Sequence, residues 1–67
     1  MIIFSVNGKK CELEAPINLM EYIEKLGVNL QYTAIAHNGT VLPKNQLAGV
    51  MLSDGDMVEI VQAVGGG

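Results

Sequence analysis

Arginine is absent from the sequence, and cations are scarce altogether. Four lysines stand against seven aspartates and glutamates, which leaves a net charge of −3 at pH 7. Because nucleic-acid binding depends on clustered cations that face the phosphates, this balance argues against a nucleic-acid partner. It favours a partner protein with a basic surface. The low charge does not indicate disorder, since 49% of the residues are apolar.

Cysteine and histidine occur once each, as Cys11 and His37. A single cysteine cannot form an internal disulfide, so the fold must hold without covalent cross-links. One histidine and one cysteine also leave no Ser-His-Asp triad and no metal-ligand cluster to recognise. We therefore expect no catalytic site and no bound metal or other cofactor in this chain. Cys11 is interpreted as a small apolar strand residue, and His37 as a residue at the rim of a sheet.

Long apolar runs are missing as well. None approaches the roughly 18 apolar residues of a membrane span, and the apolar start of the sequence lacks the basic stretch of a signal peptide. The sequence predicts a cytoplasmic protein with no membrane partner. Its 67 residues allow only one domain.

Turn residues divide the chain into short segments. Asn7-Gly8 lies between alternating apolar residues at 2–6 and 11–14. Asn-Gly readily takes the positive φ values of a type I′ turn, so the pattern predicts an N-terminal β-hairpin. Pro16 ends its second strand.

Residues Asn18 to Leu26 are predicted to form the only helix. Asn18 is a good N-cap, with Glu21 three residues later at the capping-box position. Leu19, Ile23 and Leu26 are spaced as one apolar stripe, and a glycine follows that can end the helix.

The second half of the chain has the pattern of strands joined by turns. Strands are predicted at Thr33–His37, Val41–Leu42 and Met57–Val64, with Val58 and Ile60 on the inward face of the last one. Asn38-Gly39 and Asp54-Gly55-Asp56 are predicted turns, and Lys44–Gly49 is a loop or a single helical turn.

The order of these elements predicts the fold class. One helix cannot cover both faces of a sheet, so we expect an α+β architecture with a mixed sheet of four to five strands and the helix on one face. Ubiquitin-like β-grasp folds have this order, with the first and last strands parallel in the middle. The expected domain covers residues 1–64, followed by a flexible glycine tail at 65–67.

Gly65, Gly66 and Gly67 end the sequence directly after a predicted strand. One interpretation is a frayed terminus or a cloning remnant. The other is that a tail without side chains threads its carboxylate into a narrow channel of a partner, where any Cβ would collide. The carboxylate of Gly67 is then the reactive group.

The order of these motifs resembles the ThiS proteins of thiamin biosynthesis over the whole chain. The segments that carry the resemblance are Val6-Asn7-Gly8, Ala34-Ile35-Ala36-His37-Asn38-Gly39, Val41-Leu42-Pro43-Lys44, Asp54-Gly55-Asp56-Met57-Val58-Glu59-Ile60-Val61 and Ala63-Val64-Gly65-Gly66-Gly67. The family minimum is two terminal glycines, whereas this sequence has three.

The resemblance implies that this chain is a sulfur carrier and not an enzyme. A ThiF-like E1-type enzyme would adenylate the Gly67 carboxylate with ATP, and sulfur from a donor such as a cysteine desulfurase would displace AMP. A ThiG-like thiazole synthase would then take the sulfur from the thiocarboxylate. Gly65 and Gly66 would enter the partner as a spacer, and ATP with its metal ion would belong to the partner enzyme.

A candidate partner face follows from alternation along the strand at 33–37. If Ile35 faces the helix, Ala34 and Ala36 lie on the open face of the sheet, where small side chains make a flat surface. Three acids, Asp54, Asp56 and Glu59, are the further candidates for this face.

Three other interpretations stay open at this point. The small subunit of molybdopterin synthase shares the β-grasp fold, the Gly-Gly end and the thiocarboxylate, but passes sulfur to a pterin and is expected to be longer. TGS-like regulatory β-grasp domains also carry Asp-Gly-Asp turns, within longer chains. A thiol enzyme that uses Cys11 is the third, although no base is identifiable beside it.

Overall fold

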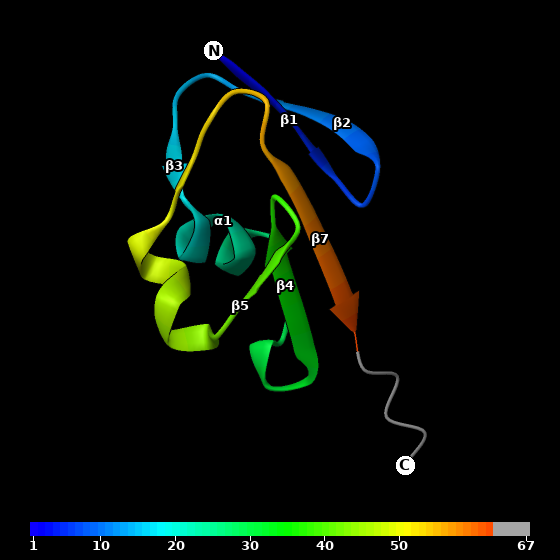
Figure 1. The fold of residues 1–67 in the computed structure, drawn as a ribbon. Coiled ribbons are helices and arrows are strands. Elements are labelled where there is room, and N and C mark those ends of the chain that lie inside the picture. Colours follow the sequence, from blue (N-terminus) through cyan, green and yellow to red (C-terminus); the bar gives the residue numbers. More distant parts are fainter. Residues whose placement is uncertain (63–67) are drawn as a thin grey trace.

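The computed structural model describes residues 1–62, which form a five-stranded sheet with one α-helix on one face (Figure 1). The sheet order is β2-β1-β7-β4-β5. Its strands are β1 (Ile2–Val6), β2 (Lys9–Leu13), β4 (Thr33–His37), β5 (Thr40–Leu42) and β7 (Met57–Gln62). β1 and β7 are parallel and the other pairs are antiparallel. The predicted α+β fold with a mixed sheet and one covering helix is confirmed.

Both Asn-Gly pairs form the predicted turns. Asn7 and Gly8 have φ values of 52° and 82°, and Asn38 and Gly39 have 51° and 85°. A type I′ turn needs positive φ at both central residues, and few residues other than glycine and asparagine accept it. These two pairs therefore join β1 to β2 and β4 to β5.

The helix α1 (Leu19–Lys25) begins where the sequence predicted and ends one residue earlier. The side chain of Asn18 caps it by accepting hydrogen bonds from the backbone N–H groups of Met20 and Glu21, at 2.9 and 3.4 Å. Leu19 and Ile23 are fully buried. The prediction that Leu26 continues this stripe is wrong, because Leu26 is already the C-cap and its side chain is 46% exposed.

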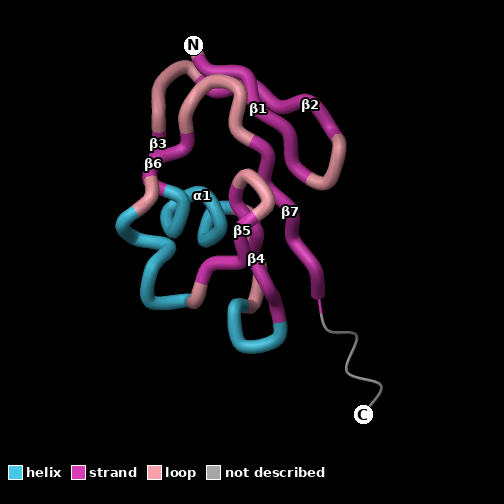
Figure 2. Tube along the Cα trace, in the orientation of Figure 1, coloured by secondary structure: helices cyan, strands magenta, loops and turns pink. Residues whose placement is uncertain are grey.

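Several short elements were not predicted. β3 (Ile17–Asn18) and β6 (Met51–Leu52) pair antiparallel beside the main sheet, as Figure 2 shows. Two turns of 3₁₀ helix, η1 (Leu30–Tyr32) and η2 (Lys44–Gly49), connect the larger elements. η2 is an elaboration of the loop or single helical turn expected there.

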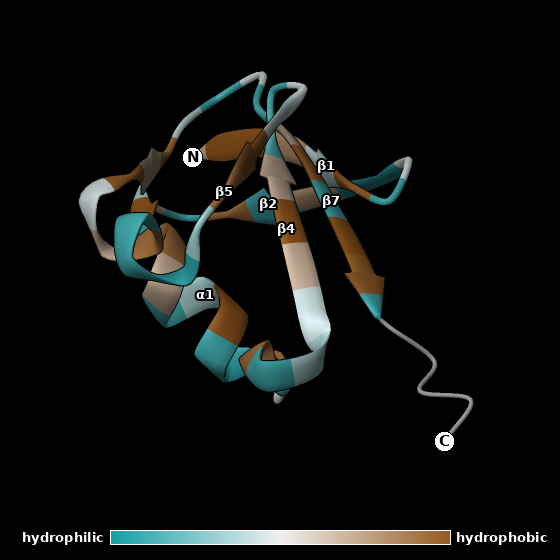
Figure 3. Cartoon of the chain, turned by 60° about the horizontal axis from the view of Figure 1, so that its bottom comes forward, coloured by the Kyte–Doolittle hydropathy of each residue, from teal (hydrophilic) through white to brown (hydrophobic). Residues whose placement is uncertain are grey.

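The core lies between α1 and the inner face of the sheet. Its buried residues are Ile2, Phe4, Leu19, Ile23, Ile35, Leu47, Leu52 and Val58. Ile60 is half-buried and packs against them, so the predicted inward face of β7 is confirmed. Apolar segments of the strands and of the inner helix surface face one another across this layer in Figure 3. Within residues 1–62 no helix has the length and apolar character that crossing a membrane requires.

Candidate functional site

The main sheet has two ends with different chemistry. The turn end consists of residues 37–38 and 53–56. The tail end consists of residues 29–33 and 60–62, where β7 finishes beside the start of β4 (Figure 1). The predicted reactive residue Gly67 and its spacer Gly65 and Gly66 lie outside the described residues, beyond this tail end.

The last half of β7 is held on both sides. On one side Thr33 pairs with Gln62 and Ile35 with Ile60. On the other side β1 has already ended, and the side chain of Asn7 takes over. Its Oδ1 accepts from the Ile60 N–H at 2.7 Å, and its Nδ2 donates to the Ile60 carbonyl at 3.2 Å. The Asn7 side chain thus replaces the missing β1 neighbour of β7 and holds Ile60 in place.

The length of the remaining chain limits where Gly67 can act. Five residues follow Gln62. Because an extended chain spans at most about 3.6 Å per residue, the predicted reaction at the Gly67 carboxylate would take place within roughly 18 Å of Gln62. Any enzyme that acts on this carboxylate must therefore bring its active site close to the tail end.

The register of β4 and β7 places three of the predicted partner-face residues together. Ile35 is buried, so Ala34 and Ala36 lie on the opposite, open face of the sheet. Glu59 is the direct partner of Ala36 on the neighbouring strand. That this face binds a partner stays a prediction.

Three exposed apolar residues on the same face were missed. Val41 pairs with Ala36, Val61 pairs with Ala34, and Met57 lies two residues before Glu59. Their exposed fractions are 67%, 61% and 59%. The same period of two that put Val58 and Ile60 inside also puts residues 57, 59 and 61 outside, so alternation along β7 was the signal that could have found two of them.

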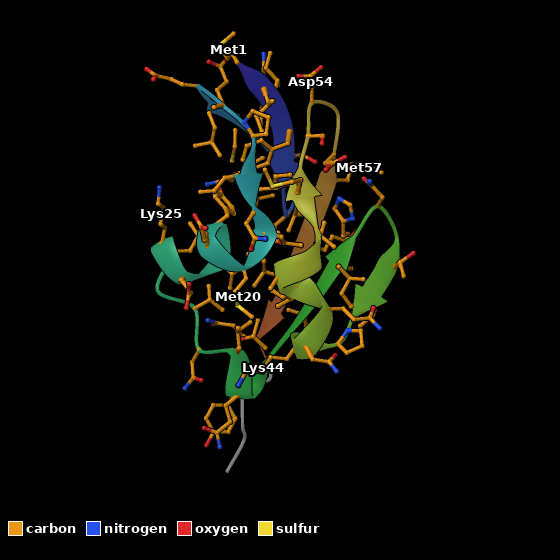
Figure 4. All side chains as sticks on the ribbon, turned by 90° about the vertical axis from the view of Figure 1, so that its left-hand side faces the viewer. Met1, Met20, Lys25, Lys44, Asp54 and Met57 are labelled. Atoms are coloured by element: carbon orange, nitrogen blue, oxygen red, sulfur yellow. The ribbon has the colours of Figure 1, made fainter. Side chains whose placement is uncertain are left out.

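Asp54 and Asp56 lie at the turn end, in the turn that leads into β7 at Met57. Figure 4 shows Asp54 at the same end of the molecule as Met1. The Oδ1 of Asp54 accepts a hydrogen bond from the Ile3 N–H at 2.7 Å. This carboxylate therefore ties the turn before β7 to the start of β1.

Both oxygens of Asp56 are engaged within the chain. Oδ2 accepts from the Ser53 N–H at 2.9 Å and lies 2.9 Å from His37 Nε2, and Oδ1 accepts from Asn38 Nδ2 at 3.2 Å. Partial burial opposes the charged form, but the hydrogen bonds from His37, Ser53 and Asn38 outweigh it and hold the pKa of Asp56 below its ordinary value. The contact of Asp56 with a partner stays a prediction; its role inside the fold is clear.

Asn38 completes the turn end. Its Oδ1 accepts from the Met57 N–H, and its own N–H donates to the Met57 carbonyl, both at 2.8 Å. Asn38 therefore forms two hydrogen bonds with the backbone of Met57, the first residue of β7, just as Asn7 does with the backbone of Ile60. The two Asn-Gly pairs make turns and also bind the central strand from either side.

The remaining candidates for chemistry are Cys11 and His37. Cys11 is half-buried on β2, and its Sγ lies 3.6 Å from the Lys9 carbonyl. Burial, and to a lesser degree the neighbouring Cys11, raises the pKa of Tyr22. The His37 ring is 20% exposed and is held by Asp56. Among residues 1–62 no three His, Cys, Asp or Glu side chains are grouped so that they could hold a metal ion.

Known proteins match this chain over nearly its full length. It is 34% identical over 62 residues to a thiazole synthase of Paramagnetospirillum magneticum, a match that covers 92% of this chain and only 19% of that protein. The chain thus spans about a fifth of that relative. It is 33% identical to the uncharacterized protein ycf40 of Porphyra purpurea, over 98% of this chain and 93% of the other.

Two solved structures are also similar to this chain. The crystal structure of the thiamine biosynthesis protein ThiS from Geobacter metallireducens superposes with a TM-score of 0.84 at 30% identity, over 98% of this chain and all of the other. The solution structure of a thiamine biosynthesis protein from the same organism has a TM-score of 0.79. A family model described as the ThiS family matches residues 4–67. The chain therefore belongs to the ThiS family.

Proposed function

We propose that this chain carries sulfur as a thiocarboxylate on Gly67 for the formation of a thiazole ring. In the first step the Gly67 carboxylate attacks the α-phosphate of ATP on a ThiF-like enzyme, releasing pyrophosphate and forming an acyl adenylate. The terminal persulfide sulfur of a donor such as a cysteine desulfurase then displaces AMP to form an acyl disulfide, and a second thiol reduces this disulfide and releases the thiocarboxylate. The observation that carries the proposal is the family match, which runs from residue 4 through the terminal Gly67.

The proposed acceptor is a ThiG-like thiazole synthase. Support comes from the Paramagnetospirillum magneticum relative, a protein named thiazole synthase that contains a stretch similar to 92% of this chain. A carrier within the same chain as a synthase is physically reasonable, because linkage raises the effective concentration of one for the other. We infer that this chain likewise delivers its sulfur to such a synthase.

We assign the catalytic groups, ATP and its metal ion to the partner enzymes, and no cofactor to this chain. The carrier contributes a positioned carboxylate. Adenylation depends on holding that carboxylate close to the ATP phosphate, and small displacements cost much of the rate. The clamp of Asn7 on Ile60 supports this role, because it fixes the end of β7 from which the tail departs.

The open face of the sheet is the proposed docking surface for the adenylating enzyme. It combines the small residues Ala34 and Ala36 with Glu59 and with the exposed apolar side chains of Val41, Met57 and Val61. Asp54 and Asp56 border this face at the turn end. An acidic carrier with an apolar strip of this kind suits a partner surface that is apolar at its centre and basic at its rim.

Mass spectrometry tests the chemistry directly. After incubation with ATP, a ThiF-like enzyme and a sulfur source, the protein should gain the mass of one oxygen-to-sulfur exchange, located at Gly67. Extending the chain by one residue beyond Gly67 should abolish this gain. Sulfur loading of the extended protein would rule out the terminal carboxylate as the carrier group, and transfer of the sulfur to a pterin precursor instead of a thiazole would overturn the proposed acceptor.

A further inference from the structure

Tyr32 is an exposed aromatic residue in a chain that has only three aromatics. The other two, Phe4 and Tyr22, pack edge to face with their ring centroids 5.3 Å apart. Tyr32 takes no part in the core cluster and is 55% exposed. A large side chain this exposed lies outside the core, and tyrosine is enriched where one protein binds another.

The backbone that carries Tyr32 is held by several local hydrogen bonds. Asn29 caps η1 by accepting from the Gln31 N–H at 3.0 Å. The Asn29 carbonyl accepts from the Tyr32 N–H at 3.2 Å and from the Thr33 hydroxyl at 2.7 Å. A side chain presented on a fixed turn loses little conformational freedom when it binds, which is the condition for an efficient anchor.

The position of Tyr32 places it at the tail end. It directly precedes Thr33, the residue that pairs with Gln62, and Gln62 is the last described residue of β7. The active site that receives Gly67 must come within roughly 18 Å of Gln62 because of the length of the chain between them. A partner surface around the entrance to that site therefore comes within reach of Tyr32.

Tyr32 is also next to the open face of the sheet. Two residues further along β4, Ala34 pairs with Val61, which is one of the exposed apolar residues of that face. A partner seated on Ala34 and Val61 reaches the end of the sheet at Tyr32. Tyr32 therefore lies between the proposed docking surface and the end of β7.

We propose that Tyr32 is an anchoring residue for the adenylating enzyme, with its ring against an apolar recess beside the entrance to the carboxylate-binding channel. This inference rests on the proposed function. We choose the adenylating enzyme over the sulfur acceptor because it works on an unactivated carboxylate, whose reaction depends most on alignment. Tyr32 acts on the affinity of the complex and does not touch the reacting atoms.

Steady-state kinetics of ATP-dependent adenylation, followed by pyrophosphate release with a ThiF-like enzyme and varied carrier concentration, tests this role. Tyr32→Ala should raise the KM for the carrier about tenfold or more with little change in kcat, as truncation of an interface anchor does. Tyr32→Phe should retain most of the affinity, since the ring provides the contact. Met51→Ala is the matched control, because Met51 is also 55% exposed but lies on β6, outside both the tail end and the open face.

Each outcome decides the inference. A rise in KM for Tyr32→Ala alone, with an unchanged melting temperature, supports it. Unchanged kinetics for Tyr32→Ala overturns it, even if later transfer to a thiazole synthase is slowed, since Tyr32 then belongs to the acceptor interface. A loss confined to kcat, or an equal loss for Met51→Ala, also overturns it. If the wild-type protein is not adenylated at all, the proposed function fails first and this inference fails with it.

Discussion

The turn end and the tail end of the same sheet are built in opposite ways. At the turn end, the side chains of Asp54, Asp56 and Asn38 accept hydrogen bonds from backbone N–H groups of β1, the turn and β7. At the tail end, Tyr32 and Val61 remain exposed, and the hydrogen bonds of Asn29 stay within its own turn. The polar side chains of the turn end form hydrogen bonds within the chain and stabilise the fold. The exposed side chains of the tail end are available to a partner.

This difference changes how the acids of the chain are understood. As a set, Asp54, Asp56 and Glu59 look like one charged patch near the last strand. Of these three acids, only Glu59 lies on the open face, beside Ala36. The two aspartates accept hydrogen bonds from backbone N–H groups at the turn end. Mutations at the turn end should therefore act on stability, and mutations at the tail end on the reaction.

The largest expected effect is the loss of the Asp56 carboxylate. Asp56→Ala leaves the Ser53 N–H, Asn38 Nδ2 and His37 Nε2 without their acceptor, in a place where the Asp56 side chain is only 13% exposed. We expect unfolding to require about 2–3 kcal/mol less, the cost of stranding partly buried hydrogen-bonding groups. Urea unfolding at pH 7 measures it.

Glu59→Ala is the matched control for Asp56→Ala. It removes the same charge from an exposed position on β7, and surface changes of this kind stay within about 0.5 kcal/mol. Equal destabilisation by the two variants would mean that the turn end is no more structural than the open face.

The next effect belongs to the tail. Gly66→Val adds a branched side chain to the segment expected to enter the channel of the adenylating enzyme. It should slow adenylation by about tenfold or more, or about 1.4 kcal/mol at the transition state. The melting temperature should stay unchanged if residues 65–67 are the flexible tail that the sequence predicts. ATP–pyrophosphate exchange measures the effect on adenylation, and a melting curve measures the effect on stability. Normal exchange by a folded Gly66→Val protein would favour the interpretation of the glycines as a frayed terminus.

A smaller effect is the acid dependence that Asp56 gives to the turn end. Hydrogen bonds depress its pKa in the folded state below the ordinary value of 3.8, so folding favours the charged form. This contribution is fully present above the ordinary pKa and is lost as the pH falls through the folded pKa. The difference in unfolding free energy between wild type and Asp56→Asn should therefore shrink below about pH 4. If this difference in unfolding free energy grew on acidification, the pKa of Asp56 would be raised in the folded state and not lowered.

The sequence predicted the local features of this fold and missed the distant ones. The turn at Asn7-Gly8 and the cap at Asn18 depend on neighbouring residues, and both are confirmed. The bonds from Asn7 to Ile60 join residues 53 positions apart, and no local pattern announces them. β3 and β6 have two residues each, too few to show a period.

The candidate site shows the same limit. Alternation along β4 placed Ala34 and Ala36 on the open face, because the side-chain period of a strand is local. The separation of Asp54 and Asp56 from Glu59 depends on how the turn folds back on β1 and on Asn38. The significance of Tyr32 appears only when Thr33 is seen to pair with Gln62. From the sequence alone, Tyr32 is an isolated aromatic in a polar stretch.

The smallest expected effect concerns Cys11, which lies on β2 and belongs to neither end. If reactivity resides only in the tail, its thiol is a packing group, and Cys11→Ser should load sulfur at the wild-type rate. The side chain is half-buried, and its Sγ lies 3.6 Å from the Lys9 carbonyl. A serine hydroxyl can make the same contact, so we expect a stability loss below about 1 kcal/mol. Thiocarboxylate formation by mass spectrometry, together with a melting curve, checks both parts. A folded Cys11→Ser protein that no longer accepts sulfur would move the chemistry from the tail to the face of β2, and the contrast between the two ends would no longer explain function.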